Sequence, residues 1–246
     1  MASQRAARKK VAYRSILLKL SGEAFQNKKT GGSLDPEVFA SMALQLKRVQ
    51  ALGPQIAIVI GGGNIFRGMR GESSGIARTT GDYMGMLATV INCMALQSAL
   101  ERIGCSTRVM TAISMPAVAE PFILRRALRH LDKGRIVIFG AGTGNPFFTT
   151  DSAAALRASE IEADVLLKAT NVDGIYSADP RKDPTAKRFA TITYSEALQR
   201  RLKIMDAAAF SLCMENRIPI VVFDFFKKGE MEKVVLGETA GTRVSE

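Results

Sequence analysis

Short apolar runs, each the length of a strand, alternate with segments the length of a helix along most of this 246-residue chain. A run that is apolar at nearly every position is typical of a strand buried on both faces, and helices between the strands supply the cover. The pattern therefore predicts an α/β fold, a three-layer sandwich with a mostly parallel central sheet between two layers of helices. The expected strands span residues 15–20, 55–60, 107–111, 135–139, 165–169 and 220–223, with 242–244 as an edge strand.

Several of the expected helices have recognisable ends. Asp35 and Pro36 are the cap and the first residue of a helix that ends at Gly53. A long helix over 81–103, for which Asp82 is a candidate cap, ends at Gly104. The others span 121–133, 150–161, 195–202, 206–216 and 230–236. No repeat or linker divides the sequence, so we expect a flexible basic arm over residues 1–12 and a single domain over 13–246.

The composition excludes a disordered chain, a collagen-like repeat and a disulfide scaffold, and the charge bears on the kind of partner. Apolar residues make up 47% and charged residues 23% of the chain, which is an ordinary globular mixture. The formal net charge is +11, but the cations are scattered, aromatic residues make up only 7%, and no expected helix has basic residues along one face. We therefore expect an enzyme of anionic substrates and regard nucleic-acid binding as the weaker alternative.

Neither a membrane nor an oxidising compartment is expected for this chain. Residues 83–100 contain no charged side chain and approach the length of a spanning helix. They include Thr89, Asn92 and Gln97, which are costly in lipid, and the mean hydropathy of the chain is only +0.07. Three cysteines without C-x-x-C spacing are typical of buried thiols in a reducing compartment. The sequence thus predicts a soluble cytoplasmic protein.

Common catalytic motifs are missing from this sequence or stand in the wrong context. Residues 71–75 match G-x-S-x-G, but a nucleophile elbow follows a strand and needs a histidine partner. His130 is the only histidine and lies near an expected helix end, where it complements the helix dipole. A single histidine also excludes histidine-rich metal sites. There is no Walker A sequence, and residues 140–145 begin like G-x-G-x-x-G but end in Asn145.

Glycine-rich turns follow four of the expected strands. Ligands of open α/β sheets bind at the carboxyl ends of the strands, where glycines let backbone N–H groups approach a phosphate. Any one of these turns could be an ordinary strand-to-helix connection, but four on one edge, with lysine and arginine among them, favour a polyphosphate site. The turns span 19–22, 61–64 (followed by Arg67), 140–145 and 170–174.

Lys19 is the most informative single residue. It lies among the last residues of a very apolar strand, where a lysine is costly to bury without an anionic partner. The alternative is a lysine whose ammonium group reaches water along an apolar stem. Asp206 could act at the site or serve only as the cap of a helix.

Five stretches resemble the amino acid kinase family and, within it, the bacterial uridylate kinases. The Lys-Leu-Ser-Gly and Gly-Gly-Gly-Asn elements are shared across the family, whereas the FRG, GDYMGM and GTGNPFFTTD stretches are specific to the uridylate kinases. The resemblance extends from about Tyr13 to the C-terminus. The stretches are LLKLSGEA (17–24), IGGGNIFRG (60–68), GDYMGMLAT (81–89), AGTGNPFFTTDSA (141–153) and LKATNVDGIYSADP (167–180).

The resemblance implies a role for each matching residue. Lys19 and Arg67 are expected at the transferred group, and Asp151 and Asp206 are similar to acidic positions that orient the catalytic lysine and nearby loops. The residues expected to bind ATP are Lys19, Leu20, Ser21, Gly22, Gly63, Arg67, Thr170, Asn171, Tyr176 and Asp179. Those expected to bind UMP are Gly62, Asp82 (on the ribose), Thr143, Gly144, Asn145, Pro146, Phe147, Phe148, Thr149 and Thr150. The UMP-binding part is expected mainly within 13–140 and the ATP-binding part within 141–246.

The implied activity is phosphoryl transfer from ATP to UMP, with Mg²⁺ held mainly through the ATP phosphates. Phosphoryl transfer requires positioning and charge neutralisation, which agrees with the basic, glycine-rich turns. The alternative is another member of the family that acts on a carboxylate or a small phosphate acceptor. Apolar residues lie all around the helix expected over 82–103, Met86, Val90 and Met94 among them, so the sequence predicts that this helix forms a subunit contact. The resemblance further implies that the assembly is a homohexamer, with UTP and GTP as candidate effectors. A Gly-Phe-Gly stretch tied to activation by GTP is replaced here by residues 27–33, NKKTGGS.

Overall fold

The computed structural model describes residues 11–26, 32–66, 75–180 and 182–246. Its centre is a nine-stranded sheet in the order β4-β3-β5-β2-β1-β6-β8-β9-β7. Every paired neighbour is parallel except β8 and β9, so the expected α/β class with a mostly parallel sheet is confirmed. The strands are β1 (Ser15–Leu20), β2 (Gln55–Ile60), β3 (Thr107–Thr111), β4 (Glu120–Pro121), β5 (Ile136–Gly140), β6 (Val165–Thr170), β7 (Thr191–Thr193), β8 (Ile220–Asp224) and β9 (Thr242–Ser245).

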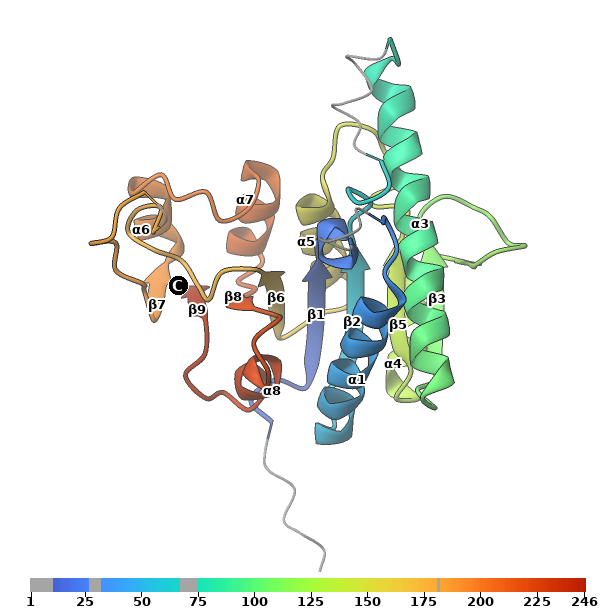
Figure 1. Cartoon of the computed structure of the whole chain (residues 1–246), viewed down its shortest axis with the longest axis horizontal. Helices are drawn as coiled ribbons and strands as arrows, with labels where there is room; N and C mark the ends of the chain where they lie inside the picture. Colours follow the sequence, from blue (N-terminus) through green and yellow to red (C-terminus); the bar gives the residue numbers. More distant parts are fainter. Residues whose placement is uncertain (1–10, 27–31, 67–74, 181) are drawn as a thin grey trace, which may run out of the picture.

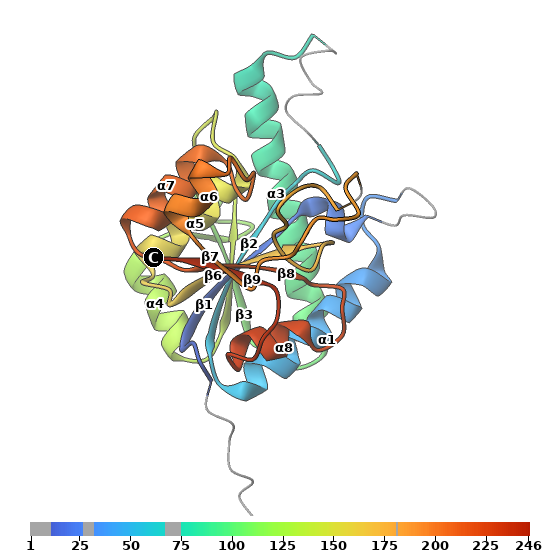
Figure 2. The ribbon, with the colours of Figure 1, turned by 90° about the vertical axis from the view of Figure 1, so that its left-hand side faces the viewer.

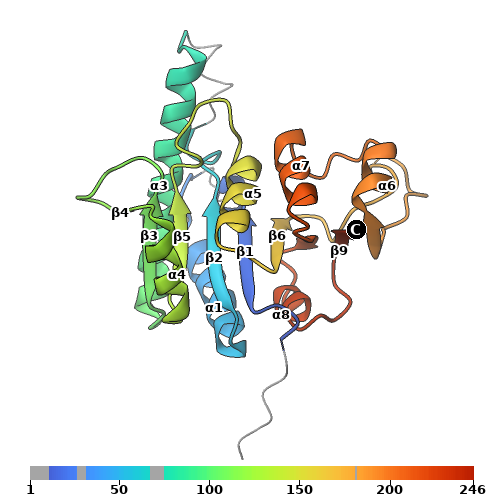
Figure 3. The same cartoon turned by 180° about the vertical axis from the view of Figure 1, so that it is seen from behind.

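Helices cover both faces of the sheet, as Figure 1 and the view from behind in Figure 3 show. One layer contains α1 (Pro36–Leu52), α3 (Arg78–Arg102) and α8 (Glu230–Val235), and the other contains α4 (Leu124–Asp132), α5 (Thr150–Glu160) and α7 (Ala207–Glu215). Figure 2 shows these layers on either side of the sheet. The remaining described helices are η1 (Gly22–Phe25), which follows β1, and α6 (Tyr194–Gln199), which follows β7.

The central strand β1 explains why two cores form. Ile16 and Leu18 pack into the core under α1 and α3, whereas Leu17 packs into the core under α5 and α7, because successive side chains of a strand point to opposite faces. All of these side chains are fully buried. A strand with both faces covered is apolar throughout, which is the pattern that predicted it.

The ends of α1 agree with the sequence prediction, whereas those of α3, α4, α5 and α6 do not, and α6 ends at Gln199 instead of the expected residue 202. Asp35 accepts a hydrogen bond from the backbone of Glu37 as the cap of α1. The helix α3 begins at Arg78, so the suggestion that Asp82 caps it is wrong. The sequence predicts Thr150 as the cap of the helix 150–161, but the cap of α5 is Thr149. The helix α4 begins at Leu124 and not at 121, because Pro121 belongs to β4.

Two further expectations about the surface are corrected. The segment 242–244 is not at the edge, because β9 lies between β8 and β7. The helix α4 does carry basic residues along one face, since Arg125, Arg126, Arg129 and Lys133 are exposed and lie opposite buried Ala127 and Leu131. This face is on the outside of the layer of helices, so it contributes to the net charge without lining the glycine-rich turns.

Residues 11 and 12, which belong to the expected arm, contact the domain. Val11 packs against the core, and the backbone N–H of Ala12 donates to the carbonyl of Val235 at 2.9 Å. The domain therefore includes residues 11 and 12.

The helix α3 is long and apolar enough to cross a membrane by length and composition, but half of its most apolar window is buried within the protein. It packs against α1, β3 and β5, as the core helix of a soluble protein does. Its first turns project beyond the carboxyl edge of the sheet (Figures 1 and 3).

Candidate active site

Two lysines lie side by side at the carboxyl edge of the sheet. Lys19 of β1 and Lys168 of β6 occupy the same register position in neighbouring parallel strands, and both side chains point to the face covered by α5. Their side chains are only 12% and 16% exposed. Two partly buried ammonium groups this close repel each other, so the arrangement requires an anion.

Asp151, in the first turn of α5, supplies a negative charge between the two lysines. Its Oδ1 lies 2.9 Å from Nζ of Lys19, and its Oδ2 accepts a hydrogen bond from Nζ of Lys168 at 2.8 Å. Within the described residues, the ion pair with Lys19 is the contact that Oδ1 makes. Within this group of three side chains, one carboxylate thus compensates only one of the two positive charges, and the Asp206 carboxylate also acts on Lys168.

These charges change the acidity of the cluster. Burial alone would raise the pKa of Asp151, but the charges of Lys19 and Lys168 outweigh it and hold that pKa below its ordinary value. Burial lowers the pKa of Lys168, the charge of Asp151 opposes this, and the like charge of Lys19 adds to it. Lys168 also donates to the carbonyl of Ile204 at 2.5 Å, which fixes its position.

The prediction that Lys19 has an anionic partner is confirmed, but the role of its neighbour was not foreseen. The signal was present, because Lys168 stands near the end of the apolar strand VLLKAT as Lys19 does in SILLKL. What the sequence does not give is the pairing of β1 with β6, which brings the two positions together.

The turns that follow β1 and β2 touch each other. The N–H of Gly61 donates to the carbonyl of Leu20 at 2.9 Å. A Cβ placed on Gly22 would lie 2.6 Å from Oδ1 of Asn64 and from the backbone of Gly61 and Gly63, so only glycine fits at position 22. The glycines at these turns therefore form one continuous backbone surface next to Lys19.

Asp82 reaches the loop that follows β5. Its Oδ2 accepts a hydrogen bond from the backbone N–H of Phe147 at 2.8 Å, and both of its oxygens accept from Nε of Arg78 at 3.0 and 3.1 Å. The loop has left-handed backbone at Gly142, Gly144 and Phe147. Phe147 and Phe148 are more than half exposed, so this loop presents aromatic rings to solvent beside a carboxylate. Arg78 is a further contact that the sequence did not reveal.

Asp206 joins the ends of two helices. As the expected cap of α7, it accepts from the N–H of Ala209 at 2.8 Å, and it also accepts from the hydroxyl groups of Thr149 and Ser152 at the start of α5. The carboxylate lies near Lys168 without contacting it. Asp206 therefore caps α7, and the same carboxylate fixes the helix that carries Asp151.

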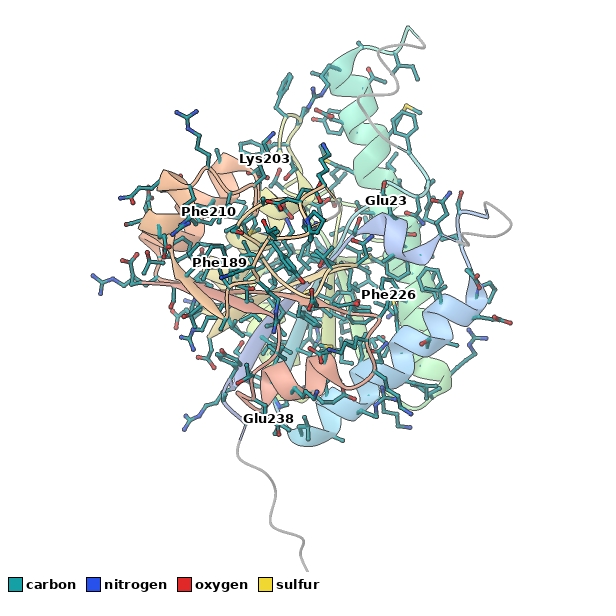
Figure 4. All side chains as sticks on the ribbon, turned by 60° about the vertical axis from the view of Figure 1, so that its left-hand side comes forward. Glu23, Phe189, Lys203, Phe210, Phe226 and Glu238 are labelled. Atoms are coloured by element: carbon teal, nitrogen blue, oxygen red, sulfur yellow. The ribbon has the colours of Figure 1, made fainter. Side chains whose placement is uncertain are left out.

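Two cavities open on either side of the end of β6. One of about 660 Å³ is lined by Thr170, Asn171, Tyr176 and Asp179, so the structure brings these expected residues together. The other, of about 450 Å³, lies between η1, β6 and the segment after β8. Figure 4 labels Lys203 of the first cavity and Glu23 and Phe226 of the second.

Arg67 lies outside the described residues, as do residues 68 and 71–74. Within the described part of the chain, no group of three or more His, Cys, Asp and Glu side chains could hold a metal ion. In the described part of the chain, the site therefore presents backbone N–H groups, two lysines and the carboxylate that lies between them. Such a set can bind and orient a chain of phosphates and stabilise negative charge that is redistributed along it.

The chain matches a known protein family and is similar to several solved structures over nearly its whole length. The model of the amino acid kinase family matches residues 14–224. The chain is similar to the crystal structure of UMP kinase from Bacillus anthracis, with 40% identity, a TM-score of 0.92 and coverage of 95% of this chain and 96% of that one. It is also similar to UMP kinase from Ureaplasma parvum, with 36% identity, a TM-score of 0.89 and coverage of 95% of this chain and 99% of that one. For uridylate kinase from Archaeoglobus fulgidus these values are 29%, 0.72, 94% and 99%.

Proposed function

The chain belongs to the amino acid kinase family, and from this membership we propose that it transfers a phosphoryl group from ATP to UMP, giving ADP and UDP. The observation that carries the proposal is the cluster of Lys19, Lys168 and Asp151 at the glycine-rich carboxyl edge of the sheet. Similarity to two UMP kinases over nearly the whole chain supports UMP as the acceptor. The enzyme would act in pyrimidine nucleotide biosynthesis in the cytoplasm.

Each substrate is assigned to one part of the edge. The ATP phosphates lie along Lys19–Gly22 and Gly63, with Arg67 as a further contact, and the adenosine lies in the cavity lined by Thr170, Tyr176 and Asp179. UMP lies against Gly62 and the loop 143–150. Asp82 accepts a hydrogen bond from the ribose, since a carboxylate with two partners keeps free lone pairs. Asp151 and Asp206 position the lysines and the start of α5.

The reaction needs no general base from the protein. The second pKa of a phosphate monoester is about 6, so the attacking oxygen of UMP is ionised at neutral pH. His130 is also far from this role, because it lies in α4 and contacts Glu120 and Arg135. Lys19 and Lys168 instead hold the transferred group in line and offset its negative charge as bonds to it form and break.

Magnesium fits this site only as a companion of ATP. The described residues provide no carboxylate set for it, and Asp151 is already engaged by two lysines. Mg²⁺ retains water and binds readily to nucleotide phosphates, where it neutralises part of their charge. Its ligands would then be phosphate oxygens and water.

The activity is tested by coupled ADP release with a panel of acceptors. We expect turnover with UMP, and much less with CMP or with dTMP, which has a ring methyl and lacks the 2′-OH. A site that hydrogen-bonds a substrate group rejects an analogue without it by up to about 10⁴. Equal efficiency with CMP would contradict the acceptor, and turnover only with acetylglutamate or carbamate would favour another activity within the family.

The dependence of activity on pH should report Lys168. Burial lowers the pKa of this lysine from the ordinary 10.5, so kcat should fall on the alkaline side at a lower pH than an ordinary lysine would give. Lys168→Arg keeps the charge at all accessible pH values and should move the alkaline limb upward, whatever its effect on absolute rate. Superimposable normalised profiles for the two proteins would contradict the assignment.

We also propose that a second copy of the chain covers the outer face of α3. Met84, Leu87, Ile91 and Met94 are 37–49% exposed and follow one another at spacings of three and four residues, which forms an apolar stripe. Of the residues expected on this face, Met94 is exposed, but Met86 and Val90 are buried and face the sheet. Monomers seldom leave such a stripe uncovered, and a two-fold axis lets the same stripe cover itself. The apolar stripe supports a contact between two subunits, and the number of six subunits comes from the family resemblance.

The variants Leu87→Lys and Ile91→Lys should reduce the particle mass measured by light scattering, because each places a charge in the apolar contact. Leu198→Lys is the matched control, since Leu198 is a similarly exposed leucine (54%) on α6. A wild-type particle at the chain mass of 26.6 kDa, active as such, would refute the association.

A further inference from the structure

The turn 61–64 lies directly on the buried face of α3. A Cβ placed on Gly62 would approach the carbonyl oxygen of Gly85 to 2.7 Å and Cβ of Ala88 to 2.8 Å. Any side chain at position 62 would therefore push the turn away from the helix. The position of this turn, which the proposed function places between the two substrates, is thus set by α3 as well as by the sheet.

A pair of buried asparagines fixes the turn to the helix. Asn92 of α3 and Asn64 donate to each other's side-chain oxygen at 2.8 and 3.0 Å. Asn92 also donates to the carbonyl of Gly61 at 2.8 Å, and Asn64 donates to the carbonyl of Ser33 at 2.6 Å. Asn92 is fully buried and Asn64 is 8% exposed. All four amide N–H groups are used, and a flipped Asn92 would set its oxygen against that of Gly61.

One turn earlier in the same helix, Thr89 holds the other substrate loop. Its hydroxyl oxygen accepts from the N–H of Ala141 at 2.7 Å, where the loop leaves β5, and the hydroxyl donates to the carbonyl of Met86 at 2.7 Å. Thr89 is 5% exposed, so water does not replace these bonds. Ala141 has a left-handed backbone, with φ of 61°, a conformation that an L-residue keeps only when its surroundings hold it.

We propose that Asn92 and Thr89 are positioning residues on α3 for the two loops that bind UMP. Asn92 fixes the position of the turn 61–64, and Thr89 fixes the position of the loop that begins at Ala141. The inference rests on the proposed function, since that function assigns UMP to both loops. Neither side chain touches substrate, and each acts through the backbone of a loop. The same helix presents Ile91 and Met94 on its opposite, exposed face, so one element carries the loops and the proposed subunit contact.

The test compares substitutions that change one hydrogen-bonding group. Thr89→Val removes only the hydroxyl and leaves the Ala141 N–H unsatisfied, so KM for UMP should rise about tenfold while KM for ATP stays within about twofold. Thr89→Ser keeps the hydroxyl and should restore KM. Asn92→Asp cannot donate to Gly61 and should lower kcat on the order of a hundredfold, because small misplacements at a reacting centre cost that much. Gln97→Ala is the matched control, since Gln97 lies on α3 and its side chain donates, among the described residues, to Glu101 and Thr107 and not to either loop.

Hydrogen exchange gives a measurement that does not depend on turnover. The Ala141 amide should exchange faster in Thr89→Val than in the wild type, and Thr89→Ser should protect it again. A lowered Tm with unchanged KM for UMP and unchanged kcat would mean a purely structural role and overturn the inference. So would unchanged exchange of Ala141 in Thr89→Val. If Asn92→Asp does not fold, the comparison of Thr89→Val with Thr89→Ser still tests the positioning role. An inactive wild type would refute the proposed function, and the exchange of the Ala141 amide would then test the positioning role by itself.

Discussion

We expect Lys19→Ala to lower kcat on the order of a hundredfold, with a much smaller change in KM for UMP. A charge aimed at the group in transfer contributes mainly in the transition state, and removing one such group costs about 3 kcal/mol. Removing Lys19 also removes the like charge that lowers the pKa of Lys168. The alkaline limb of the kcat profile should therefore move upward in the same variant.

Lys133→Ala is the control for this variant, because Lys133 is an exposed lysine at the end of α4. Steady-state kinetics on both proteins give the comparison. A decrease in kcat of less than threefold in Lys19→Ala would exclude Lys19 from the reaction.

Asp151→Asn should have the second large effect, on both activity and stability. It leaves Lys19 and Lys168 in adjacent register positions without the carboxylate that lies 2.9 and 2.8 Å from them. Removing one partner of a mostly buried charge cluster costs about 3 kcal/mol or more of unfolding free energy, and the displaced lysines should lower kcat at least as much as Lys19→Ala does.

The pH dependence of unfolding distinguishes this cause from a packing defect. The pKa of Asp151 is lowered in the folded protein, so its stabilisation is complete above the unfolded value of about 3.8 and is lost as pH falls through the lower, folded value. The difference between wild type and Asp151→Asn should therefore be constant at neutral pH and shrink only in strong acid. Asp132→Asn, at the exposed end of α4, is the control, and equal loss of stability in the two variants would contradict the role of Asp151.

Most of the fold could be predicted from local pattern. The strands β1, β2 and β3 begin and end at the expected residues because their apolar runs are bounded by polar or glycine residues. The ends of α3 and α4 were less visible. Arg78 extends α3 by one turn to pair with Asp82, and Pro121 enters a two-residue strand beside β3, and both outcomes depend on tertiary contacts that no local signal contains.

The candidate site could be predicted where the signal lies in a single residue, but not where it depends on which strands become neighbours. Lys19 stood out because a lysine in an apolar strand is costly to bury. The pairing of Lys19 with Lys168 and the contact of Asp82 with Phe147 depend on which strands and loops become neighbours in space. Similarly, helical periodicity revealed that α3 is apolar on every side, but only its packing shows that Val90 faces inward and Ile91 outward.

Lys19 and Lys168 lie far apart in the sequence, and this separation has a consequence for folding during translation. The strand β1 lies at the centre of the sheet, yet one of its neighbours, β6, comes from the last third of the chain. Until residues 151–170 have emerged, Lys19 has neither its counter-ion nor its flanking strand, so burying β1 is unfavourable. Such non-local contacts slow folding. The nascent N-terminal half therefore cannot assemble the candidate nucleotide site by itself, because the counter-ion and one flanking strand of Lys19 both come from the second half of the chain.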